Sequence, residues 1–170
     1  RSTLFPYTTL FRSRSYRIEH CEYDWTTSES LFDSDWLEGF NNNPIEDYQN
    51  SINTTLPYTH YQFNIPNDRC RLKMSGNYRI TIIDEDEGDE EVMQVEFYVI
   101  EPRMDIGLNV SSNTDIDHND SHQQVDMALR YNSLRITNLD EELKTVVMQN
   151  WRDDTARRDL RPTSISMQGL

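Results

Sequence analysis

Residues 75–100 read SGNYRITIIDEDEGDEEVMQVEFYVI, and this stretch decides the fold. β-Branched and aromatic residues fill positions 78–83 and 92–100, which predicts two β-strands. Between them, residues 84–91 hold seven acids in eight positions, with Gly88 free to turn. A run of like charges stays in solvent, so it must form a turn rather than part of a core. The stretch therefore predicts a β-hairpin with an acidic, solvated tip.

The four residues that open this stretch, Ser75-Gly76-Asn77-Tyr78, resemble the corner of immunoglobulin-like sandwiches. In that corner the tyrosine hydroxyl forms a hydrogen bond with nearby backbone. Ile80 stands where an antibody domain carries its second cysteine, so the disulfide between the two sheets is absent. Alternating residues from Tyr16 onward and over 58–65 predict further strands, and residues 26–50 read as a long ordered loop with one helical turn. We expect a mainly β fold, an immunoglobulin/fibronectin-III-like antiparallel β-sandwich.

Charge and hydropathy exclude several classes of protein. The chain has 170 residues with 16 Lys plus Arg against 30 Asp plus Glu, a net charge of −14. Such a negative chain does not suit binding to nucleic acid or to an anionic membrane surface without help. Its apolar runs are far too short for a membrane span. We expect an acidic, folded protein with no nucleic-acid partner and no direct membrane span.

The domain organisation predicted from the sequence has three parts. Residues 3–13, TLFPYTTLFRS, match the translation of a common sequencing adapter, so residues 1–13 are interpreted as a non-native scar. Residues 14–103 form the β-sandwich domain, which ends at Glu101-Pro102-Arg103. Residues 104–170 are expected to be the truncated start of a second β-rich domain, with strands at 106–110 and 125–131. Residues 139–151 combine helical spacing with β-branched residues, and a strand is favoured there.

Patterns typical of catalysis or cofactor binding are absent from the sequence. It has no glycine-rich phosphate loop, no serine nucleophile elbow and no zinc helix with two histidines, so we expect no enzyme and no cofactor. One group of acidic and amide residues resembles the start of a calcium loop. Asp115, Asp117 and Asn119 stand at alternate positions, and Asp126 follows later. Asp120 stands where that loop needs glycine, so a polar turn between strands is the favoured interpretation and calcium the second.

The two cysteines leave two interpretations open. In an oxidising compartment Cys21 and Cys70 could form a disulfide, and two reduced buried thiols fit the sequence equally well. The cysteines therefore do not determine the compartment.

Several longer phrases together resemble one protein family. Taken in order, residues 16–25 (YRIEHCEYDW), 37–48 (LEGFNNNPIEDY), 53–61 (NTTLPYTHY) and 75–78 (SGNY) look like the amino-terminal domain of the type IX secretion system plug protein of Bacteroidota. Residues 114–123 and 149–153 resemble the start of its next region. The resemblance implies a periplasmic, non-enzymatic accessory protein, associated with the outer membrane. Its implied partner is the large β-barrel translocon, whose periplasmic mouth the family is thought to seal.

The aromatic loop at residues 36–48 is the predicted contact surface. Exposed aromatics next to Asn and Pro suit a rigid recognition loop, and the candidate residues are Trp36, Phe40, Asn42, Pro44 and Tyr48. The competing interpretation is that these aromatics only fix the loop to its own domain. A second function class also stays open, a β-sandwich module that binds calcium or glycans, with Trp25 and Trp36 as sugar platforms.

Overall fold

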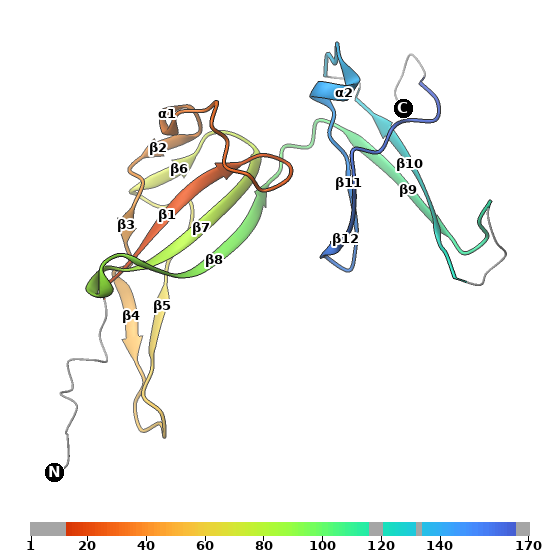
Figure 1. Ribbon diagram of the computed structural model, residues 1–170. Coiled ribbons are helices and arrows are strands. Elements are labelled where there is room, and N and C mark those ends of the chain that lie inside the picture. The colour runs from red at the N-terminus through yellow and green to blue at the C-terminus, as the bar shows by residue number, and fades with distance from the viewer. Residues whose placement is uncertain (1–12, 116–120, 132–133, 166–170) are drawn as a thin grey trace. The chain divides into compact units, whose positions relative to one another are not determined.

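The computed structural model describes residues 13–115, 121–131 and 134–165 (Figure 1). The chain divides into two units, Arg1–Ile100 and Glu101–Leu170. Residues 1–12, almost all of the predicted adapter-derived scar, lie outside the described residues. Both units are mainly β, and all their strand pairs are antiparallel, as predicted for a β-sandwich.

The first unit is built on a four-stranded sheet with the order β3-β1-β7-β8. Two further pairs, β2 with β6 and β4 with β5, belong to the same unit. In chain order its elements are β1 (Arg14–Cys21), α1 (Asp33–Trp36), β2 (Leu37–Gly39), β3 (Asn43–Pro44), β4 (Asp47–Asn50), β5 (Thr59–Gln62), β6 (Cys70–Leu72), β7 (Gly76–Asp84), the 3-10 turn η2 (Glu85–Glu87) and β8 (Glu90–Val99).

The core of this unit lies on one face of the four-stranded sheet. Alternate residues of β1 and β7 point to that face, because side chains in a strand alternate between its two sides. Tyr16 lies opposite Ile82, and Ile18 lies opposite Ile80. The connecting segments cover this face with the buried side chains Trp36, Leu37, Ile45 and Cys70. The hairpin predicted at residues 75–100 is therefore the centre of the fold, and its acidic tip is η2 and the turn at Gly88.

The second unit contains two separate β-hairpins. β9 (Asp105–Ser111) pairs with β10 (Gln124–Arg130), and β11 (Val146–Gln149) pairs with β12 (Arg152–Arg158). A single helical turn, α2 (Leu139–Glu142), precedes β11. Leu129 is the only buried hydrophobic side chain among this unit's described residues.

Two predictions about local structure need correction. The loop expected at 26–50 contains the predicted helical turn, α1, but also the strands β2, β3 and β4. These strands are two to four residues long, too short for alternation to show in the sequence.

The second correction concerns residues 139–151, where a strand was favoured. They begin as the helix α2 and become a strand only at β11. The Asn138 side chain accepts a hydrogen bond from the Asp140 amide at 3.2 Å, and Glu142 accepts one from the Asn138 amide at 3.0 Å. This cap satisfies free backbone donors and allows one helical turn before the β-branched residues.

Candidate partner-binding surfaces

The segment 36–48 is held to the first unit by side chains that act as backbone partners. The Asn41 side chain donates to the Ile18 carbonyl and accepts from the Ile18 amide, both at 2.9 Å. It thus pairs with β1 as a neighbouring strand would. The buried Asn43 donates to the Phe40 carbonyl at 2.7 Å, and the Phe40 amide donates to the Arg69 carbonyl at 3.0 Å. The backbone of the segment is therefore well fixed where its side chains reach solvent.

Four of the five predicted contact residues are exposed. Phe40 is 75% exposed and Tyr48 is 41% exposed, and Asn42 and Pro44 are exposed as well. Phe40 and Asn42 lie in the short connection that links β2 to β3, and Pro44 lies on β3 itself. Tyr48 lies on β4, beside Tyr61 of β5. Figure 1 shows that this segment runs from the α1 and β2 end of the unit to the β4–β5 hairpin.

Trp36 does not belong to the exposed set. It is only 3% exposed, and its ring centre lies 5.7 Å from that of Tyr78 and 6.4 Å from that of His20. Because it packs in the core, it anchors the segment and cannot offer a face to a partner or a sugar. For this residue the structure matches the competing interpretation, in which the aromatics fix the loop to its own domain.

Both cysteines are free and buried in the structure. Cys70 lies on the core face, with its Sγ 3.4 Å from the Tyr16 hydroxyl. Cys21 follows His20 on β1 and points to the opposite face of the sheet, because neighbouring strand residues alternate. Burial raises the pKa of the Cys21 thiol, which keeps the thiol protonated and poorly reactive. The two thiols are separate in the structure, and the disulfide of an oxidising compartment stays a prediction.

The calcium pattern lies only partly within the described residues. Asp117 and Asn119 are outside them. The Asp115 amide donates to the side chain of Gln124 at 3.0 Å, and Gln124 donates to Asp126 at 3.1 Å. Across residues 13–115, 121–131 and 134–165 there is no group of three or more His, Cys, Asp or Glu that could hold a metal ion.

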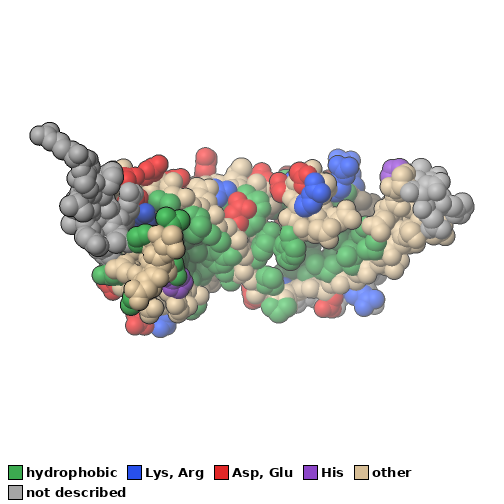
Figure 2. Space-filling model, turned by 90° about the horizontal axis from the view of Figure 1, so that it is seen from below, with side chains coloured by type: hydrophobic (Ala, Val, Ile, Leu, Met, Phe, Trp, Pro, Cys, Tyr) green, Lys and Arg blue, Asp and Glu red, His purple; other side chains and the backbone are tan. Residues whose placement is uncertain are grey.

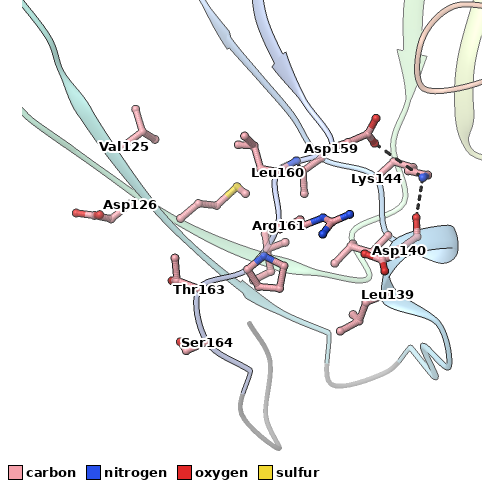
Figure 3. Close-up of a pocket in the computed structure, with 15 residues that line it drawn as sticks. Val125, Asp126, Leu139, Asp140, Lys144, Asp159, Leu160, Arg161, Thr163 and Ser164 are labelled. Carbon is pink, nitrogen blue, oxygen red and sulfur yellow. Dashed lines mark hydrogen bonds and ion pairs between the residues drawn. The ribbon is translucent and has the colours of Figure 1, made fainter.

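The second unit has a cleft that the sequence analysis missed. It has a volume of about 610 Å³ and lies between β10, α2 and the segment that follows β12 (Figure 3). Its apolar wall includes Val125, Met127 and Leu129 of β10, together with Leu139, Leu143 and Leu160. The alternation of apolar residues along β10 was the available sign in the sequence, but the opposite wall comes from residues 10 to 39 positions further along the chain.

One side of this cleft is charged and hydrogen-bonded. Lys144 donates to the Asp140 carbonyl at 2.7 Å, and its Nζ lies 3.9 Å from Oδ1 of Asp159 (Figure 3). The Leu160 amide donates to the Thr145 hydroxyl at 3.0 Å. The cleft thus combines an apolar wall with charged and hydrogen-bonded groups on its other side.

The apolar face of the β9–β10 hairpin continues from the cleft into solvent. The register places Ile106 opposite Leu129, Leu108 opposite Met127 and Val110 opposite Val125. The three β9 side chains are 52–65% exposed. Figure 2 shows hydrophobic side chains gathered in a band along this unit.

Comparisons with known proteins place these features in a family context. A family model described as the type 9 secretion system plug protein 1st domain matches residues 10–101. The chain is also similar to the crystal structure of a hypothetical protein from Parabacteroides merdae, with a TM-score of 0.86 and 40% sequence identity. That match covers 94% of this chain and 40% of the other, so this chain spans two-fifths of the length of that protein. No curated protein gives a significant match. None of the helices in the described residues is long and apolar enough to cross a membrane.

Proposed function

Because the chain belongs to the type 9 secretion system plug protein family, we propose that it is a non-enzymatic accessory subunit that seals or gates the periplasmic side of the outer-membrane translocon barrel. Membership of the family implies a part in type IX secretion and an association with the cell envelope. The family match over residues 10–101 is the observation that carries the proposal. The proposed location is the periplasm, next to the outer membrane.

The packing of the first unit supports a sealing role. A plug has to keep its shape against a pore, and close-packed aromatic cores resist deformation. Tyr16 stacks on Phe63 with ring centres 4.5 Å apart, and Tyr78 stacks on Phe97 at 5.5 Å. Both tyrosines are at most 2% exposed. The first stack joins the four-stranded sheet to a segment that covers it, and the second joins two strands within the sheet.

We place the contact with the barrel on Phe40, Asn42, Pro44 and Tyr48. Their side chains are exposed, whereas hydrogen bonds fix the segment beneath them. The backbone of Phe40 is bonded at both its amide and its carbonyl, and the Asn41 side chain is bonded to the backbone of β1. A preorganised backbone lowers the entropy that binding would otherwise lose. An exposed phenylalanine on a rigid turn is also the kind of anchor that dominates binding energy in interfaces.

The test is co-purification from a Bacteroidota host that carries out type IX secretion. The affinity-tagged chain is recovered from detergent-solubilised outer membranes, beside its Phe40→Ser and Phe32→Ser variants. Phe32 is 78% exposed and lies outside the segment, so it is the matched control. We expect one very large outer-membrane protein with the native chain and the Phe32 variant, and much less of it with the Phe40 variant. Failure of the native chain to recover any such protein overturns the function. Equal recovery with all three overturns only the contact surface.

A further inference from the structure

The tip of the β4–β5 hairpin, residues 51–58, presents large apolar side chains to solvent. Ile52 is 82% exposed, Leu56 is 80% exposed and Tyr58 is 60% exposed. Figure 1 shows the hairpin projecting away from the four-stranded sheet, with this tip at its far end. Apolar side chains that are grouped and exposed to this degree form a surface that gains free energy when it leaves water.

The hairpin also lies in a part of the sequence without charge. Residues 48–67 contain no Asp, Glu, Lys or Arg, although the chain as a whole is 27% charged. The nearest preceding acids, Glu46 and Asp47, lie at the base of the hairpin, where β4 begins. Moving a charged side chain out of water is costly, and no such cost arises when this tip is buried.

Hydrogen bonds inside the tip satisfy several of its polar groups. The Ser51 amide donates to the Tyr58 carbonyl at 2.8 Å, and the Tyr58 amide donates to the Ser51 hydroxyl at 2.9 Å. The Thr54 hydroxyl donates to the Leu56 carbonyl at 2.9 Å. Because these groups keep their partners when water is removed, the tip can enter an apolar medium at a lower cost.

The form of the hairpin favours a lipid surface over a protein partner. A stable protein interface takes about 20–30 residues from each side, and a projecting tip of eight residues offers far fewer. A lipid surface needs no matching shape. Behind the tip, Tyr48 of β4 lies opposite Tyr61 of β5, with ring centres 6.2 Å apart. Tyrosines prefer the headgroup level of a membrane, and aliphatic side chains prefer the layer below it.

We propose that residues 51–58 form an interfacial anchor, which inserts into the headgroup layer of a neutral phospholipid surface. Ile52 and Leu56 enter the edge of the acyl layer, and the Tyr48–Tyr61 pair stays at the level of the headgroups. The net charge of −14 repels anionic lipid, so the anchor selects zwitterionic lipid. The proposal does not rest on the plug function, because it follows from the hairpin alone.

The experiment mixes the purified chain with vesicles at low ionic strength. One set of vesicles consists of phosphatidylcholine, which is zwitterionic, and the other of phosphatidylserine, which is anionic. Sedimentation of the vesicles gives the fraction of protein bound at rising lipid concentration. We expect binding to phosphatidylcholine, and binding to phosphatidylserine that is at least about tenfold weaker.

Two isoleucine variants locate the anchor. Ile52→Ser removes an apolar side chain from the tip, and Ile100→Ser removes one that is 81% exposed and lies outside the hairpin. We expect about a tenfold loss of affinity for phosphatidylcholine with the first and less than about a twofold change with the second. The comparison of the two lipids uses the native chain, so it stands even if a variant fails to fold.

A polarity-sensitive dye attached to Leu56→Cys reports insertion, since Cys21 and Cys70 are buried. We expect its emission to shift to the blue when phosphatidylcholine vesicles are added. Three results would each overturn the proposal: no binding of the native chain to phosphatidylcholine, equal binding of the native chain and Ile52→Ser, or a bound chain whose dye does not shift. A dye that shifts with the purified translocon barrel but not with vesicles would also overturn it, and would identify a protein partner.

Discussion

The Tyr78 hydroxyl donates a hydrogen bond of 2.7 Å to the backbone carbonyl of Met74, and the tyrosine is completely buried. This bond is the one predicted from the Gly-Asn-Tyr corner. It ties the connection between β6 and β7 to the strand at the centre of the sheet. The ring of Tyr78 also packs edge-on against His20, with centres 5.1 Å apart. One residue thus fixes both a loop and the core.

Replacing this tyrosine by phenylalanine tests the corner. Tyr78→Phe keeps the ring but leaves the Met74 carbonyl without that donor, so we expect a loss of about 1–2 kcal/mol in the free energy of unfolding. Urea denaturation followed by fluorescence measures it. Tyr58→Phe is the control, because Tyr58 is 60% exposed, and it should change stability by less than about 0.5 kcal/mol. Equal stability of all three proteins would contradict the role of the bond.

The same residue predicts a loss of stability at alkaline pH. Burial raises the pKa of Tyr78 to about 12. In the unfolded chain a tyrosine titrates near about pH 10, so above that pH the unfolded state releases a proton that the folded state keeps. The stabilisation is complete below about pH 10 and is lost as the pH rises toward about 12.

Comparison with Tyr78→Phe isolates this effect from other titrating groups. Across that window we expect the stability of the native chain to fall by up to about 3 kcal/mol relative to the variant, enough to reverse its advantage of about 1–2 kcal/mol. Denaturation curves at several pH values between about 9 and about 12 give the difference. A difference that stays constant with pH would show that Tyr78 titrates normally.

Gly39 and Gly88 form a matched pair for backbone strain. Gly39 has φ +105°, and a Cβ there would lie 2.1 Å from the Arg69 carbonyl oxygen. Gly88 has φ +77°, with nothing within 4 Å of a Cβ. We expect Gly39→Ala to destabilise the first unit by more than about 2 kcal/mol, and Gly88→Ala by about 1 kcal/mol. Thermal melting ranks the two, and the reverse order would contradict the close approach of β2 to Arg69.

The Asn41 side chain should control the rigidity of the proposed contact segment. Asn41→Ala removes both hydrogen bonds to Ile18 and leaves two backbone groups of β1 without them. We expect a loss of about 2 kcal/mol and faster amide exchange over residues 40–45, measured by hydrogen–deuterium exchange. Asn64→Ala, at an exposed position, is the control. Unchanged exchange in the Asn41 variant would mean that the segment is held by other contacts.

The net charge of −14 predicts salt-dependent association with the translocon. If an acidic chain is steered to a basic rim, added salt screens the attraction and lowers the association rate, while the dissociation rate changes little. Surface plasmon resonance on the immobilised barrel at low and high salt separates the two rates. An association rate that is the same at both salt concentrations would contradict electrostatic steering of the chain to the barrel.

Most long strands of the fold could be predicted from the sequence, and most short ones could not, although the four-residue β5 lies within the strand predicted at 58–65. β1, β7, β8, β9 and β10 are seven to ten residues long, and alternation marks each of them. β2 and β6 are three residues each and form because they pair with one another across thirty intervening positions. β12 reads RDDTARR, which has no apolar alternation, and its strand form depends on pairing with β11.

The candidate site was predictable only in part, for a related reason. Phe40 and Trp36 are both aromatic and lie close together in the sequence, yet one is 75% exposed and the other 3%. Which of them faces solvent depends on the core around Tyr78 and His20, whose residues come from other strands. The cleft in the second unit could not be predicted from the sequence, because its walls come from separate segments that meet only after folding.

The most direct measurement of the central claim is the conductance of the purified translocon barrel, freed of its own plug, in a planar bilayer. The account predicts a large open conductance that falls when this chain is added on the periplasmic side and does not change when it is added on the other side. An open conductance that persists while the chain is bound to the barrel would contradict the proposal that this protein seals it.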